Sequence, residues 1–288
     1  MNGVERELNS LMSNTLECNR RYFKNVYEGM VVRGCKPKTI EFYLYALGVF
    51  ACNFKNIDIG LLSPLEIAMA LQGLEELRYS AHTIRHVKRS VKMFYTKFRG
   101  KVFARFIKLG EVHPELRHCD LITKEELWGM ISAAKTLRDM AMLAVLYDGA
   151  LRRQELLGLR LRDVDFSNGI VHITVTGKTG TRTIPLTFSG LILKRYVDAT
   201  PRFWEQGSLW DIGINGLRAM IDSVRDRIRI NKRVYPYVFR HSRITELSNI
   251  LSEAQLKCFA GWSQNSPMPR NYVHLCVNDL DRVILAKQ

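Results

Sequence analysis

The chain has 288 residues, of which 47% are hydrophobic and 25% are charged. This is the composition of a folded globular protein, and it excludes an intrinsically disordered or collagen-like chain. The 43 lysines and arginines outnumber the 28 aspartates and glutamates, and the formal net charge is +15. Such a balance favours a polyanionic partner, with nucleic acid ahead of an anionic membrane. The length allows one large domain or two smaller ones.

Membrane, secretion and metal signals are weak. No run of about 18 apolar residues is present, so no membrane-spanning helix is expected. The first residues lack the basic and then apolar order of a secretory signal. The six cysteines lie far apart without a C-x-x-C pair, which favours reduced thiols in a cytosolic protein. His82 and His86 lie four residues apart, but Arg85, Lys88 and Arg89 surround them, so we expect no metal there.

The first 110 residues are predicted to be helical. Apolar positions recur at helical spacing in residues 38–53 and 64–77, and Ser63 is a credible N-cap for the second segment. The segment 80–108 has an apolar stripe with steps of three and four residues, which predicts one buried helix face. The stripe consists of Ile84, Val87, Val91, Phe94, Tyr95 and Phe98.

The segment 80–108 also has a cationic face, with nine lysines and arginines and no acidic residue. A charge run is usually a solvated helix face. Like charges at this spacing repel one another, however, and a phosphate backbone would turn that repulsion into attraction. We therefore predict that this helix contacts the DNA backbone. The candidate DNA-binding residues are Arg85, Lys88, Arg89, Lys92, Lys97 and Arg99.

A second domain is predicted at 122–288, separated from the helical domain at 1–110 by a linker at 111–121 without periodicity. Thr123 and Glu126 have the spacing of a capping box at its start. Residues 171–176 and 182–186 alternate between apolar and polar, which predicts a β-hairpin with Lys178 in its turn. Helical patterns occupy 137–147, 153–159, 189–197, 215–230, 240–250 and 253–259, with short helices around 272 and at 279–286. The chain is thus predicted to be mainly α with a small antiparallel β-sheet.

The turn sequence Gly177-Lys178-Thr179 invites comparison with a nucleotide-binding P-loop. That loop needs another glycine five residues before Gly177, where this chain has His172. It also needs a helix that begins at the lysine, whereas a strand is expected here. We therefore reject the P-loop and expect no nucleotide cofactor.

Three further clusters follow one another in a suggestive order. They are 146–160 with Arg152, Arg153 and Glu155, 237–245 with Tyr237, Arg240 and His241, and 260–275 with Trp262 and Tyr272. With Lys178 between the first and second clusters, they resemble the tyrosine recombinases, the family of phage integrases and Xer-type resolvases. The last cluster and the Asp-Leu-Asp after it look most like the archaeal integrase branch. The resemblance is close from about 123 onward. The N-terminal half resembles only in kind the family's helical core-binding domain.

The resemblance implies a role for each of these residues. Leu151 and Glu155 fix the register so that Arg152 rather than Arg153 is the first catalytic arginine, and Arg240 is the second. Lys178, Trp262 and Tyr272 fall on the family's lysine, His-or-Trp and nucleophile positions. Tyr237 stands where the commonest family members have histidine, which leaves the general base open. His241 more often packs than reacts, so it is placed with Glu155 behind the catalytic groups. Tyr235 and Tyr237 are rival nucleophiles.

The implied chemistry explains these residue types. A tyrosine oxygen can hold a 3′-phosphate as a covalent intermediate, which conserves the energy of the phosphodiester bond. Two arginines match the charge that grows on the non-bridging oxygens. Lys178 would protonate the leaving 5′-oxygen, Trp262 would donate its indole N–H to the phosphate, and Glu155 would orient the arginines. Neither metal nor nucleotide is required.

At the level of the whole protein, the resemblance implies a two-domain clamp around double-stranded DNA that exchanges strands within a homotetramer on paired sites. Accessory proteins can direct such enzymes, and the expected location is the cytoplasm, at the nucleoid. A C-terminal helix at 278–287 is expected to dock on protein, within the subunit or on its neighbour. Two alternatives stay open, namely a type IB topoisomerase and a catalytically inactive DNA-binding protein. The target sequence and the choice between integration, excision and resolution are not encoded in these patterns.

Overall fold

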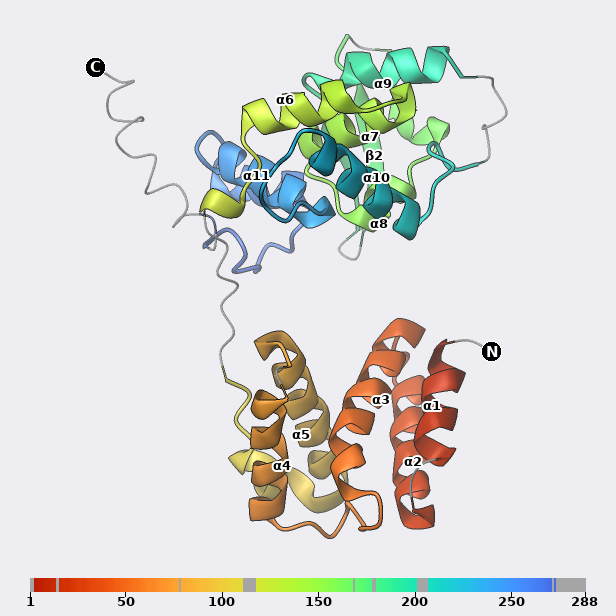
Figure 1. Cartoon of the computed structure of the whole chain (residues 1–288), viewed down its shortest axis with the longest axis vertical. Coiled ribbons are helices and arrows are strands. Elements are labelled where there is room, and N and C mark those ends of the chain that lie inside the picture. Colours follow the sequence, from red (N-terminus) through yellow and green to blue (C-terminus); the bar gives the residue numbers. More distant parts are fainter. Residues whose placement is uncertain are drawn as a thin grey trace, which may run out of the picture. The chain divides into compact units, whose positions relative to one another are not determined.

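The computed structural model describes residues 3–13, 16–77, 79–110, 118–167, 169–177, 180–200, 207–270 and 272. It separates into two compact units, Met1–Pro114 and Glu115–Gln288. The described chain is mostly helical, and a small antiparallel sheet lies in the second unit (Figure 1). No helix among the described residues is long and apolar enough to cross a membrane.

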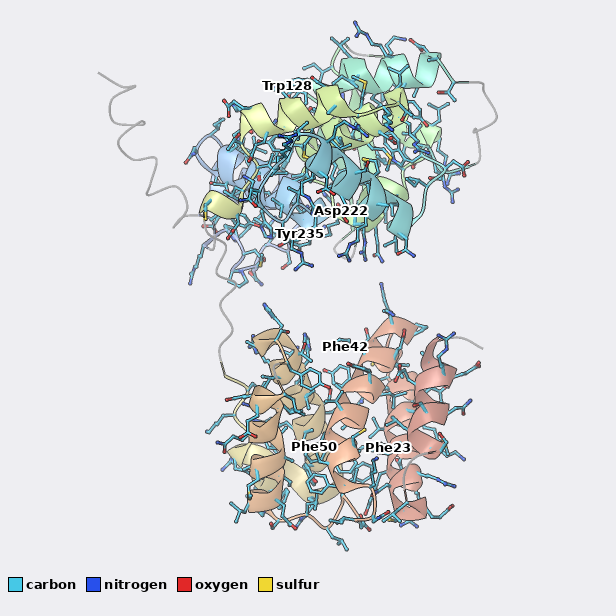
Figure 2. All side chains as sticks on the ribbon, viewed as in Figure 1. Phe23, Phe42, Phe50, Trp128, Asp222 and Tyr235 are labelled. Atoms are coloured by element: carbon cyan, nitrogen blue, oxygen red, sulfur yellow. The ribbon has the colours of Figure 1, made fainter. Side chains whose placement is uncertain are left out.

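The first unit is a helical bundle. Its elements are α1 (Gly3–Ser13), α2 (Glu17–Val32), α3 (Pro37–Ala51), η1 (Cys52–Phe54), α4 (Pro64–Glu76), α5 (Ala81–Phe103) and η2 (Ala104–Phe106). Helix α4 begins with a complete capping box, in which Ser63 and Glu66 satisfy each other's backbone N–H groups. Phe23 and Phe50 are fully buried between the helices (Figure 2).

Helix α5 has the predicted buried face but is shorter than the predicted segment 80–108. Ile84, Val87, Val91 and Phe94 are buried against the rest of the bundle. Gly100 interrupts the helix with a φ of 89°, a backbone conformation that glycine adopts without a steric penalty. After this kink the chain ends α5 and makes the single turn η2, so the segment is not one continuous helix.

The second unit wraps around one buried helix. Its elements are η3 (His118–Asp120), α6 (Lys124–Ala133), α7 (Leu137–Asp148), α8 (Arg153–Leu157), η4 (Leu161–Asp163), β1 (Val164–Asp165), β2 (His172–Gly177), β3 (Gly180–Pro185), α9 (Ser189–Asp198), α10 (Ile214–Arg227), α11 (Pro236–Ser248) and α12 (Glu253–Ala260). The predicted capping box of Thr123 and Glu126 begins α6. Helix α7 is buried from Ala141 to Asp148 and packs against α6, α9 and α11.

The sheet has the strand order β1-β2-β3, with both pairs antiparallel. Strands β2 and β3 form the predicted hairpin, in which Val175 pairs with Arg182 and Gly177 with Gly180. The two-residue strand β1 was not predicted, because two residues are too few to show an alternating pattern.

Two local features bring the later site together. After α7 the chain turns sharply at Ala150, which has a positive φ of 45°, and Arg152 then serves as the N-cap residue of α8. Helix α11 begins at Pro236, four residues before the predicted start. Tyr237, Arg240 and His241 therefore lie within its first two turns.

Candidate active site

The C-terminal end of α12 gathers three arginines from distant parts of the chain. Three successive backbone carbonyls each accept a hydrogen bond from one guanidinium group. The pairs are Phe259 with Arg182 Nε at 2.8 Å, Ala260 with Arg240 Nη2 at 2.6 Å, and Gly261 with Arg152 Nη2 at 2.9 Å. The last carbonyls of a helix have no partner within it, and the helix dipole makes this end attractive to cations.

Gly261 makes this arrangement possible. It ends α12 in the left-handed conformation, with a φ of 61°. A Cβ atom at this position would lie 2.6 Å from Nη1 of Arg182, so any larger residue would displace that side chain. The glycine therefore serves both the backbone turn and the close approach of the arginine.

Glu155 is the buried anion of the arginine cluster. Its side chain is only 3% exposed and accepts two hydrogen bonds from Arg182, at 3.0 and 2.9 Å. It also accepts from Nη1 of Arg152 at 2.6 Å and from the backbone N–H of Arg152 at 2.9 Å. Burial opposes ionisation, but these hydrogen bonds and the charge of Arg182 outweigh it and lower the pKa of Glu155 to about 2. Glu155 is thus a carboxylate that fixes both arginines.

Arg240 is almost completely buried, with 1% of its surface exposed. It donates to the carbonyl of Ala150 at 2.5 Å and to that of Ala260 at 2.6 Å. Burial and the neighbouring charge of Arg152 lower the pKa of Arg240 to about 10, so it remains a cation at neutral pH. A guanidinium group has five N–H donors, and these two carbonyls fix its orientation without using all of them. Arg152 is held in the same way by Glu155 and Gly261, so both cations have fixed orientations.

Tyr272 lies in the same site. It is 2% exposed, and its hydroxyl oxygen is 2.7 Å from Nδ1 of His241. Its ring also packs against the indole of Trp262, with ring centroids 5.6 Å apart. Burial raises the pKa of Tyr272, while the positive charges of Arg240 and Arg152 act in the opposite direction. The phenol therefore stays protonated, but it lies within the electrostatic influence of both arginines.

His241 and Tyr237 complete the wall of the site. Burial and the charge of Arg240 lower the pKa of His241 to about 4, so its imidazole is neutral at pH 7. The ring of Tyr237 meets it edge-on, with centroids 4.8 Å apart, and is 44% exposed. Tyr237 therefore lies at the solvent side of His241, while Tyr272 lies at its buried side.

Most of the predicted catalytic residues come together in this site. The guanidinium carbon of Arg240 lies 5.8 Å from the ring centroid of Trp262 and so links the arginine cluster to the aromatic side of the site. Together with the contacts described above, this brings together Arg152, Glu155, Arg240, His241, Trp262 and Tyr272, and Tyr237 borders them. The rival residue Arg153 is exposed. Tyr235 is 40% exposed beside the guanidinium of Arg233 (Figure 2). Lys178 and the C-terminal segment 278–287 lie outside the described residues, as does most of the linker.

Arg182 is the residue that the sequence did not reveal. It lies on β3 in the predicted hairpin, but its position beside the active-site candidates depends on contacts with Glu155 and Phe259, 27 and 77 residues away in the chain. An arginine on the exposed face of a hairpin would give the same sequence pattern as Arg182, so the sequence alone does not distinguish the two. Its side chain is 8% exposed, and at least three of its N–H groups are engaged, so it supports the site and does not offer a binding surface.

The cationic face of α5 is less available than its sequence indicates. Lys88 pairs with Glu75 of α4 at 3.5 Å, and Nζ of Lys92 donates to the carbonyl of Ile107 at 3.0 Å. Lys97 and Arg99 donate to the carbonyls of Asn25 and Leu62, each at 2.6 Å. Arg85 is half-buried, whereas Arg89 is exposed. The acid missing from the helix itself is thus supplied in part by its neighbour, and several of these cations also hold the bundle together.

Among the described residues, no three or more histidine, cysteine, aspartate or glutamate side chains gather into one group. His86, one of the paired histidines, instead packs edge-on against Phe42, with ring centroids 4.6 Å apart.

The chain thus consists of a helical unit followed by a helical unit with a small sheet, and the second unit holds a buried tyrosine under the electrostatic influence of two oriented arginines. Comparison with known proteins assigns this chain to a class. Residues 22–105 match the N-terminal SAM-like domain of phage integrases, and residues 120–209 match the phage integrase family.

Individual proteins are similar over most of the chain. Tyrosine recombinase XerC of Oceanobacillus iheyensis is 22% identical over 243 residues, which cover 76% of this chain and 79% of that protein. Tyrosine recombinase XerA of Saccharolobus solfataricus is 22% identical over 260 residues, or 87% of each chain. The crystal structure of a lambda integrase dimer bound to a core site is similar in fold, with a TM-score of 0.71 at 13% identity over 88% of this chain and 76% of that one. The chain belongs to the phage integrase family of tyrosine recombinases.

Proposed function

We propose that this protein is a site-specific DNA recombinase that cuts and rejoins strands through a 3′-phosphotyrosine intermediate. The observation that carries the proposal is the position of Tyr272. Its hydroxyl lies in a buried site, under the influence of the charges of both Arg152 and Arg240. A phosphodiester bound to those two cations would lie next to a nucleophile of the required type.

Each step of the chemistry then has a side chain to perform it. Arg152 and Arg240 bind the non-bridging oxygens and stabilise the charge of the transition state, where preorganised cations have their largest effect. Trp262 donates its indole N–H to the phosphate. Glu155 holds Arg152 by two hydrogen bonds and is itself paired with Arg182. Glu155 and Arg182 therefore act by positioning Arg152.

Lys178 is proposed as the general acid that protonates the leaving 5′-oxygen. Its neighbours Gly177 and Gly180 pair across the hairpin, and Gly177 lies close to Glu155 and Arg152, so the turn begins beside the site. The reaction conserves the energy of the broken bond in the phosphotyrosine linkage, so the chemistry requires no nucleotide. The acid, the two cations and the nucleophile are all side chains, so it requires no metal either.

Double-stranded DNA is the proposed partner of both units. The net charge of +15 and the exposed Arg89 support this, since most of the affinity for DNA comes from phosphate contacts. We further propose a homotetramer on paired sites, accessory proteins that set direction, and a location at the nucleoid in the cytoplasm. The similarity to XerA of Saccharolobus solfataricus supports an archaeal type of integrase.

A plasmid assay tests the proposal against both alternatives. A supercoiled plasmid carries two copies of the DNA that flanks the gene, and a matched plasmid carries none. A recombinase deletes or inverts the intervening segment only on the first plasmid, and Tyr272→Phe abolishes the product while Tyr235→Phe retains it. Relaxation of both plasmids would indicate a topoisomerase. Salt-sensitive binding without any strand cleavage would indicate an inactive binding protein.

A further inference from the structure

The general base of the proposed reaction is not evident from the motif positions. Tyr237 stands at the motif position where the commonest family members have a histidine, and a neutral phenol is a far weaker base than an imidazole. The described part of the site contains one other group that can take a proton from the nucleophile, and that group contacts it directly. His241 follows Arg240 in α11, and its Nδ1 is 2.7 Å from the hydroxyl oxygen of Tyr272.

We propose that His241 is a catalytic residue, the general base that removes the phenolic proton of Tyr272. This proposal rests on the proposed function and assigns a residue to a step that the motif leaves unfilled. The distance lies within the range required for proton transfer to a positioned base. The two rings also pack against each other, with centroids 5.6 Å apart, so the contact does not depend on a single flexible torsion.

The step balances in atoms and charge. The hydroxyl oxygen of Tyr272 forms a bond to phosphorus while its proton passes to Nδ1 of His241. The bond from phosphorus to the 5′-oxygen breaks, the electron pair remains on that oxygen, and the ammonium group of Lys178 supplies its proton. In rejoining, the imidazolium returns its proton to the departing phenolate, as microscopic reversibility requires.

The charges around His241 make its basicity depend on the substrate. Arg240 faces it from the same helix, Arg152 lies across the site, and Tyr237 and Tyr272 flank its ring. Without DNA, burial disfavours an imidazolium ion at His241, and the guanidinium group of Arg240 adds to that penalty. A bound phosphate, which gains further negative charge in the transition state, offsets the two arginines and favours the protonated imidazole. The phenol is therefore activated only when a phosphodiester occupies the site.

The test separates the base from the acid and from a merely structural role. The substrate is a nicked suicide duplex carrying the flanking DNA, and the rate of covalent complex formation is measured in a single turnover. His241→Asn keeps an acceptor oxygen close to the place of Nδ1 but cannot take the proton. His172→Asn, on the partly exposed first residue of β2, is the matched control. A second substrate carries sulfur in place of the 5′-bridging oxygen, so its leaving group needs no proton.

We expect His241→Asn to slow cleavage by ~10²–10⁴-fold, the usual effect of losing a general base, while His172→Asn matches the wild type. The sulfur substrate should rescue Lys178→Ala but not His241→Asn. A fluorinated tyrosine at position 272, which ionises more easily, should shrink the defect of His241→Asn, whereas a misplaced nucleophile would show the same defect with either tyrosine.

Three results would overturn the assignment. Cleavage by His241→Asn within about threefold of the wild type would leave no room for a base effect of the usual size. A defect that the sulfur substrate repairs would place His241 on the acid side. A defect that the fluorinated tyrosine leaves unchanged would make it only a positioning residue. By contrast, if the wild-type protein forms no covalent complex, or if the Tyr272→Phe variant still forms one, the proposed function is refuted as well.

Discussion

Arg182→Met should destabilise the second unit by about 3 kcal/mol, because it removes the main partner of a buried carboxylate. Arg182 donates two of the hydrogen bonds that Glu155 accepts, and both side chains are less than 10% exposed. The pKa of Glu155 is about 2 in the folded chain against an ordinary 4.5. That difference corresponds to roughly 3 kcal/mol of net favourable interaction, to which Arg182 contributes the largest share and Arg152 the rest. Breaking a buried ion pair by removing one partner typically costs about 3–5 kcal/mol, which agrees in size.

Tryptophan fluorescence measures this effect in the intact protein. All four tryptophans, at positions 128, 204, 210 and 262, belong to the second unit, so a urea titration followed by their emission reports its unfolding alone. Arg195→Met on α9 is the matched control, because Arg195 is exposed. The double variant Arg182→Met/Glu155→Gln should recover part of the loss, since it also removes the buried carboxylate that had lost its main partner.

The pH dependence gives a second reading of the same interaction. The folded pKa of Glu155 lies below its ordinary value, so its stabilisation is complete above about pH 4.5 and is lost as the pH falls toward 2. Glu155→Gln should flatten the stability curve in this window. His241 has a folded pKa of about 4, below its ordinary 6.5, so its protonation in the unfolded chain lowers the stability as the pH falls from 6.5 to 4, mainly at higher pH than the Glu155 window. A loss below about 0.5 kcal/mol in Arg182→Met, within the range of surface substitutions, would refute the argument.

Three further outcomes are expected. Gly261→Ala should lower the stability of the second unit by roughly 1–3 kcal/mol in the same fluorescence assay, because alanine is strained at a φ of 61° and its Cβ meets Arg182. Asn19 is fully buried and bonds the backbone at both Ile57 and Ile59, so Asn19→Ala should markedly speed amide hydrogen exchange at Ile59, and unchanged exchange would contradict this. Arg89→Ala should reduce the salt slope of DNA binding by about 1, and a slope equal to that of the wild type would remove α5 from the DNA interface.

Local signals in the sequence predicted much of the fold. The N-cap at Ser63 and the capping box at Thr123 fix helix starts within a few residues of chain, so they can be recognised without tertiary information. The alternation at 171–176 likewise predicted β2. By contrast, Gly100 gave no sign of the kink in α5, because a glycine within a helical pattern is often tolerated.

The site was only partly predictable because its contacts join distant segments. The residue types and their order identified Arg152, Arg240 and Tyr272 as candidates through family resemblance. Nothing local indicates that the carbonyl of Ala260 receives Arg240, or that His241 meets the hydroxyl of Tyr272 from 31 residues away. The same reason explains the cationic face of α5, since a charge pattern read along one helix does not include the acid that the next helix supplies.

The most direct test of the central claim identifies the atom that becomes linked to DNA. The wild-type protein is incubated with nicked suicide DNA carrying its flanking sequence and denatured in detergent, and the covalent complex is digested and analysed by mass spectrometry. The account predicts a nucleotide attached through a 3′-phosphate to the peptide that contains Tyr272, and no complex with Tyr272→Phe. Attachment at Tyr235 or Tyr237, or a complex that persists in Tyr272→Phe, would contradict it.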